Sequence, residues 1–111
     1  MINVKYLTLF SGFFAFLVVA LGAWTRLADA GLGCPDWPGC YGFATLPLSS
    51  EDIALANDRF PESPYQLVKA IPEVVHRFFA TSLGLLIIGI CYLLTKHNIG
   101  NRNTKVLSFF L

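Results

Sequence analysis

The chain has 111 residues, of which 55% are hydrophobic and only 14% are charged, whereas an ordinary soluble domain carries about 25% charged residues. The formal net charge is +1 without any basic cluster, which argues against a nucleic-acid partner. All seven acidic residues lie between Arg26 and His76. This composition predicts a membrane protein with its acidic residues gathered in, or at the edge of, one connecting segment.

The first apolar segment runs from about residue 6 to residue 24 without a charge, between Lys5 and Arg26. About 20 apolar residues cross the hydrocarbon core of a bilayer, so this segment is predicted to be a transmembrane helix. The alternative is a cleaved signal peptide, whose apolar region is shorter, at roughly 7–15 residues. Small side chains that predict close packing on another helix recur along the segment at Gly12, Ala15, Val19 and Gly22.

Residues 25–72 form a long loop that holds six acidic and three basic residues. The following turn, residues 95–105, holds three basic residues and no acid. Because Lys and Arg are enriched on the cytoplasmic side, we expect the amino terminus and this turn to be cytoplasmic and the loop to be external. Within the loop, Ser50 is expected to open a short helix that ends at about Arg59, before two prolines.

The external loop contains Cys34 and Cys40, separated by prolines and glycines that favour turns. An external compartment permits disulfides. Their spacing differs from the C-x-x-C of redox motifs, which favours a structural staple over a redox-active pair and leaves a zinc site as a weaker alternative. Cys91 belongs to the second apolar segment, too far away to join them, and is interpreted as an apolar packing residue.

The second predicted span covers about residues 73–94, with Pro72 at its first helical position. Glu73, His76 and Arg77 fall three and four positions apart, so they project from one helical face. Ionisable groups in a membrane helix are costly and indicate function. Imidazole is an axial ligand of haem iron, while a carboxylate and a guanidinium suit proton transfer and propionate binding.

Each of these three residues also has a purely structural interpretation. Glu73 can complement the dipole of the helix, and Arg77 can extend to the lipid headgroups. His76 can be an interfacial histidine held by hydrogen bonds. The three residues share one helical face, and that face continues with small residues in the following turns of the helix. This arrangement favours the functional interpretation. A third apolar segment begins at residues 106–111, so the sequence predicts an all-α membrane protein with two transmembrane helices and the start of a third.

Three stretches resemble the haem A synthase family, in its cysteine-containing branch: residues 22–27 (GAWTRL), 30–42 (AGLGCPDWPGCYG) and 73–77 (EVVHR). The resemblance covers nearly the whole chain and matches the amino-terminal third of a typical member. It implies the front part of a four-helix transmembrane bundle, in a protein of eight spans built as two such bundles. By resemblance, residues 1–111 are the amino-terminal part of an oxidoreductase that converts a methyl group of haem O to the formyl group of haem A.

The resemblance also implies site residues and partners. His76 would be an axial ligand of haem iron, Glu73 the acidic residue at the haem edge, Arg77 a cofactor-binding residue, and Cys34 and Cys40 a disulfide. Haem b is implied as cofactor, with haem O as substrate and haem A as product. The implied partners are haem O synthase, cytochrome c oxidase assembly, the lipid bilayer and a second copy in a homo-oligomer. The implied location is the bacterial inner membrane, or the mitochondrial inner membrane in a eukaryote.

Two other functions stay open at this stage. One is a membrane thiol-disulfide oxidoreductase that uses Cys34 and Cys40 with a quinone. The other is a haem-binding assembly subunit without catalysis. By the same resemblance, each bundle supplies a pair of histidines that can face a haem. Because the histidine that pairs with His76 would lie beyond Leu111, we expect this fragment alone to be inactive.

Overall fold

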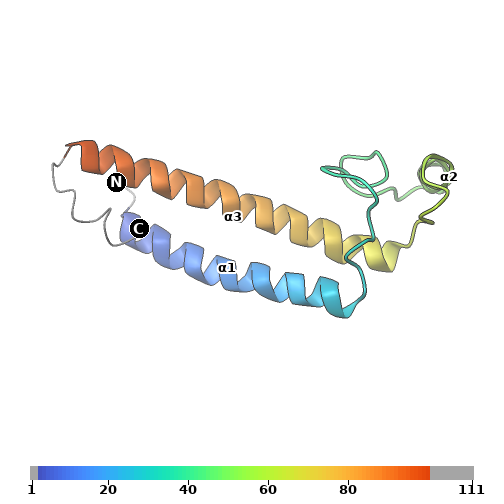
Figure 1. Cartoon of the computed structure of the whole chain (residues 1–111), viewed down its shortest axis with the longest axis horizontal. Coiled ribbons are helices and arrows are strands. Elements are labelled where there is room, and N and C mark those ends of the chain that lie inside the picture. Colours follow the sequence, from blue (N-terminus) through green and yellow to red (C-terminus); the bar gives the residue numbers. More distant parts are fainter. Residues whose placement is uncertain (1–2, 101–111) are drawn as a thin grey trace.

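The computed structural model describes the backbone of residues 3–100 and the side chains of residues 3–97. It contains three helices, α1 (Val4–Leu27), α2 (Ser50–Arg59) and α3 (Leu67–Gly100). α1 and α3 lie side by side and run in opposite directions, while α2 and the rest of the loop lie beside the start of α3 (Figure 1). The predicted all-α class is confirmed.

The ends of α1 and α2 follow ordinary capping chemistry. The Asn3 side chain accepts a hydrogen bond from the Lys5 N–H at 3.1 Å, and the Ser49 side chain accepts one from the Asp52 N–H at 3.1 Å. Such caps satisfy N–H groups that have no partner within the helix. α2 matches the short helix predicted from Ser50 to about Arg59.

Pro72 lies inside α3, so its predicted place at the first helical position is wrong. Ala70 is completely buried against the loop, and a Cβ atom on Gly33 would collide with the Lys69 carbonyl group. Packing of the loop therefore stabilises a helical turn ahead of the proline. A proline there removes the hydrogen bond that its own N–H would have made to the preceding turn, and its ring crowds the carbonyl group four residues earlier, so this packing must offset both costs.

α3 also extends beyond residue 94, where the second span was predicted to end, and reaches Gly100. The first residues of the predicted turn 95–105 are therefore helical. Basic side chains such as His97 suit the last turns of a helix, whose carboxyl end is partly negative. The rest of that turn and the predicted third span, residues 106–111, lie outside the described residues.

α1 and α3 meet along a regular seam. Residues at least partly shielded from solvent recur three and four positions apart, close to the 3.5-residue repeat of helices packed side by side. The Phe14 and Phe79 rings meet in the middle of the seam with their centroids 5.8 Å apart. Along α1 these seam positions are Val4, Leu7, Ser11, Phe14, Val18, Leu21 and Thr25.

The predicted stripe of small residues is therefore only partly in contact with α3. Gly12 and Val19 are exposed, whereas Ala15 and Gly22 are half-buried. The stripe repeats the spacing of the seam one residue further along the chain, which is about 100° around the helix, so only one side of the stripe lies against α3.

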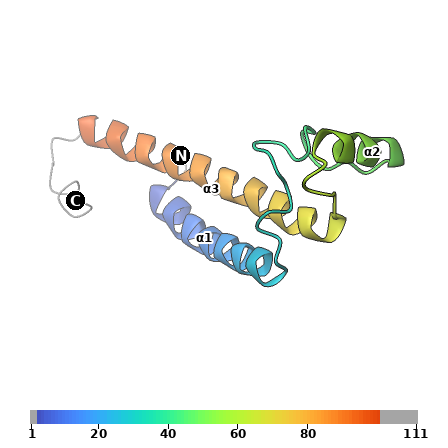
Figure 2. The same ribbon diagram turned by 45° about the vertical axis from the view of Figure 1, so that its right-hand side comes forward.

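Most of the apolar surface of the two long helices faces outward. Figure 2 shows the faces of α1 and α3 that point away from each other. Both helices are long and apolar enough to cross a membrane, and only 6% of each apolar window is buried, unlike the core helix of a soluble protein. Exposed apolar area of this extent marks surfaces that meet lipid or other protein.

The loop has a small core of its own. Tyr41 is buried and packs edge-on against Phe60 and Tyr65, with ring centroids 5.6 and 5.2 Å away. Burial, with a smaller contribution from Tyr41, raises the pKa of the Tyr65 hydroxyl. The Arg59 guanidinium lies 5.7 Å from the centre of the Phe43 ring. The loop is thus a folded cap on the start of α3.

Candidate functional site

The His76 side chain lies against α1 at Gly22. A Cβ atom on Gly22 would come within 3.0 Å of His76 Cε1 and 3.5 Å of both ring nitrogens. Gly22 therefore leaves the space that the imidazole occupies, and a larger residue there would displace the ring.

The His76 imidazole has no hydrogen-bond partner among the described residues, although its Nδ1 atom is buried. Burying a polar atom without a partner costs free energy, of the order of 1–3 kcal/mol. Among the described residues, His76 is therefore not the hydrogen-bonded interfacial histidine that the structural interpretation predicts. The ring is available to a ligand.

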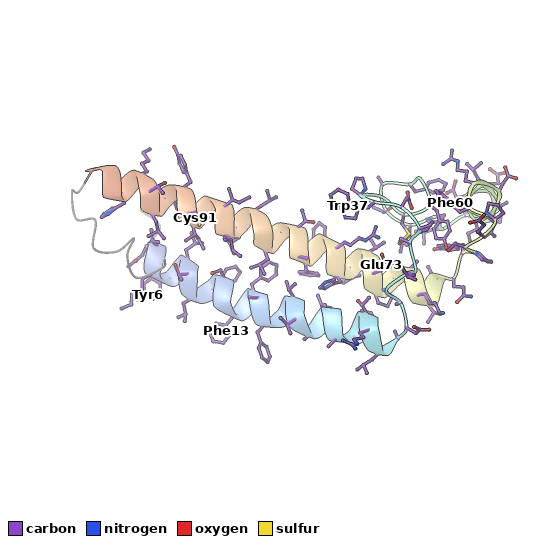
Figure 3. The ribbon with its side chains drawn as sticks, in the orientation of Figure 1. Tyr6, Phe13, Trp37, Phe60, Glu73 and Cys91 are labelled. Carbon is purple, nitrogen blue, oxygen red and sulfur yellow. A yellow bond between two sulfur atoms is a disulfide. The ribbon has the colours of Figure 1, made fainter. Side chains whose placement is uncertain are left out.

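Glu73 lies where the loop meets α3 (Figure 3) and is buried, with a relative exposure of 7%. Its Oε2 atom accepts a hydrogen bond from the backbone N–H of Cys34 at 2.9 Å. Its Oε1 atom forms an ion pair with the Arg77 guanidinium. The carboxylate thus has a partner on each oxygen, which a buried charge requires.

Arg77 joins this carboxylate to the loop. Its Nη1 atom donates to the backbone carbonyls of Asp36 at 2.8 Å and Gly39 at 3.0 Å. Both carbonyls belong to the segment between Cys34 and Cys40. The guanidinium is therefore held by three acceptors instead of extending to the membrane surface.

The sulfur atoms of Cys34 and Cys40 lie 2.14 Å apart, within bonding distance, and the Cα atoms are 4.9 Å apart. Cys40 is completely buried and Cys34 is 5% exposed. The Asp36 carboxylate closes the same segment by accepting hydrogen bonds from the N–H groups of Tyr41 and Gly42. A buried pair in a segment closed by these hydrogen bonds is typical of a structural staple.

These groups surround a cavity of about 440 Å³ between the carboxyl-terminal end of α1 and the first half of α3. The Thr25 hydroxyl donates to the carbonyls of Leu21 at 2.9 Å and Pro72 at 3.2 Å, which ties the last turns of α1 to α3. The cavity is lined by Gly22, Thr25, Arg26, Asp29, Gly31, Glu73, His76 and Arg77.

The three predicted residues of α3 thus meet at one cavity, and Cys34 touches it through Glu73. Within the described part of the chain, no three His, Cys, Asp or Glu side chains converge as a metal site, so His76 stands alone as a candidate ligand. Cys91 is exposed at the far end of α3, so its predicted packing role is not seen in this helix pair (Figure 3). The sequence interpretation missed Thr25 and Arg26 as cavity residues. Arg26 could have been found from its spacing of four from Gly22, which puts both on one face of α1.

Comparison with known proteins decides the family. The sequence pattern of the cytochrome oxidase assembly protein family matches residues 5–111. The chain belongs to this family. A protein named heme A synthase, from Shewanella oneidensis, is 47% identical over 83 residues, which are 75% of this chain and 25% of that protein. The predicted membership of the haem A synthase family is therefore confirmed.

The chain spans about a quarter of the length of this curated relative. No solved structure matches the chain. The family match covers both long helices and the loop, and so includes every residue of the cavity wall.

Proposed function

We propose that the intact protein is a haem A synthase, an oxidoreductase that converts a methyl group of haem O to the formyl group of haem A for cytochrome c oxidase. The observation that carries the proposal is the unpartnered imidazole of His76, which lines a cavity beside the buried Glu73. The 47% identity to a heme A synthase supports the substrate class. This chain supplies the front part of the protein and is inactive alone.

The residues of the cavity fit a haem. His76 offers a ring nitrogen as axial ligand, and Gly22 leaves the space for the ring. Glu73 serves the oxidation by taking up protons, and Arg77 adds positive charge beside the cofactor while it holds the Glu73 carboxylate. Bound haem supplies the methyl group that is oxidised, and haem b is the cofactor that we assign to the intact protein.

The membrane arrangement belongs to the same proposal. α1 and α3 cross the bacterial inner membrane, with the amino terminus cytoplasmic and the loop 25–72 external. The outward apolar faces of both helices support the packing of two further helices in a four-helix bundle. Haem O synthase and a second copy of the protein are the partners that we propose.

The proposed activity can be tested in bacterial cells that make haem O but lack their own haem A synthase. Expression of the intact protein should yield haem A in extracts separated by reversed-phase chromatography. Haem bound to the purified protein without any haem A in the cells would instead support the haem-binding assembly subunit.

Burial of both cysteines favours a structural disulfide over the thiol-disulfide oxidoreductase. In the chain-entropy model so short a ring contributes only about 2–3 kcal/mol. We expect the double variant Cys34→Ser/Cys40→Ser to insert into the membrane and to retain less haem, measured by absorption of the purified protein. Mass-shift alkylation of unreduced protein should label the free thiol of Cys91 but neither Cys34 nor Cys40. Labelling of Cys34 and Cys40 would contradict the disulfide.

A further inference from the structure

Two guanidinium groups line the cavity, and they differ in what they already bind. Arg77 is engaged with Glu73 and two loop carbonyls. The Arg26 side chain makes neither a hydrogen bond nor an ion pair with any residue that the structure describes. Arg26 is thus the cation of the cavity wall that is free to meet an incoming anion.

The position of Arg26 is fixed relative to His76. Gly22, which the His76 ring touches, lies four residues before Arg26 in α1, so both are on one face and one helical turn apart. The neighbouring Thr25 holds this turn against α3 through the Pro72 carbonyl. A ligand bound to His76 therefore has Arg26 beside it, toward the loop end of the cavity.

Asp29 is the acidic group of the cavity wall that could neutralise Arg26. Its side chain is 98% exposed and pairs with Lys69 at 3.7 Å. An exposed pair of this kind is weak, but it directs the Asp29 carboxylate toward Lys69. Asp29 therefore does not neutralise the positive charge of Arg26.

We infer that Arg26 binds the propionate carboxylates of the haem that occupies this cavity, an inference that rests on the proposed function. Arg26 is exposed at the rim of the cavity, and a guanidinium matches a carboxylate with two parallel, charge-assisted hydrogen bonds. The same chemistry would suit a lipid phosphate, and the position near the carboxyl end of α1 would suit a helix cap. The test must separate these roles.

Haem and haem dimethyl ester, whose carboxylates are blocked, should be titrated into haem-depleted intact protein while the Soret absorption is followed. We expect the protein to bind haem about tenfold or more tightly than the diester, as for the loss of a charge-assisted hydrogen bond. Arg26→Gln should lose this preference and bind the diester as before, which also shows that the variant folds. Arg26→Lys should recover part of the preference. Arg59→Gln, which removes a positive charge from α2 outside the cavity, should keep it.

A full preference in Arg26→Gln would overturn the inference and leave Arg26 as a helix cap or a lipid contact. Equal weakening of haem and diester in Arg26→Gln would also overturn it, because the effect would then be structural. If the unaltered protein bound haem and Arg26→Gln kept its preference, the proposed function would stand without the inference. Failure of the unaltered protein to bind either compound would contradict the proposed function itself, and the inference with it.

Discussion

Replacing His76 with alanine is expected to lower the haem content of the intact protein, or change its low-spin spectrum, and to abolish haem A formation. The ring has no protein partner among the described residues, so its removal breaks no hydrogen bond within this part of the chain. Loss of the axial ligand is then the main consequence. Haem content follows from the pyridine haemochrome spectrum, and haem A from chromatography of extracted haems.

A second substitution tests the same site without touching the ligand. Gly22→Val places side-chain atoms where the His76 ring lies, since even a Cβ would come within 3.0 Å of Cε1. It should reproduce the loss of haem that is expected for His76→Ala. Gly12→Val is the matched control, because a Cβ at Gly12 meets nothing within 4 Å. An unchanged spectrum and product in His76→Ala would show that His76 is not a ligand.

Much of this arrangement follows from local sequence chemistry. An uncharged run of membrane-spanning length predicts α1, and a capping serine followed by two acids predicts α2. Spacing by three and four residues was enough to bring Glu73, His76 and Arg77 to one face of α3.

What could not be predicted depends on contacts between distant segments. The helical turn before Pro72 exists because Ala70 packs on the loop, and no local pattern encodes that contact. Two of the three acceptors of Arg77 are backbone carbonyls, which any sequence supplies, so the residue types could not reveal them. Gly22 belonged to a predicted packing stripe, but its partner, a histidine ring on α3, follows only from how the two helices are aligned.

The same contacts change how Glu73 must be tested. The Glu73 carboxylate accepts a hydrogen bond from the Cys34 N–H and forms an ion pair with Arg77, so it has a structural role in addition to any role in proton transfer. A glutamine at this position keeps the shape and can still accept from Cys34, but it cannot take up a proton. Arg77 would keep its bonds to the carbonyls of Asp36 and Gly39. The loop should therefore stay attached to α3 in Glu73→Gln.

We accordingly expect Glu73→Gln to retain haem while haem A formation falls by about 10²–10⁴-fold, the usual effect of losing an acid–base group. Haem O or a partly oxidised haem should accumulate, which chromatography of extracted haems would detect. Asp36→Ala is the control, because it removes the carboxylate that accepts from Tyr41 and Gly42 and so loosens the loop without altering Glu73. It should retain far more activity than Glu73→Gln. If both variants instead lost haem and product together, Glu73 would be a clamp for the loop and not the group that exchanges protons during oxidation.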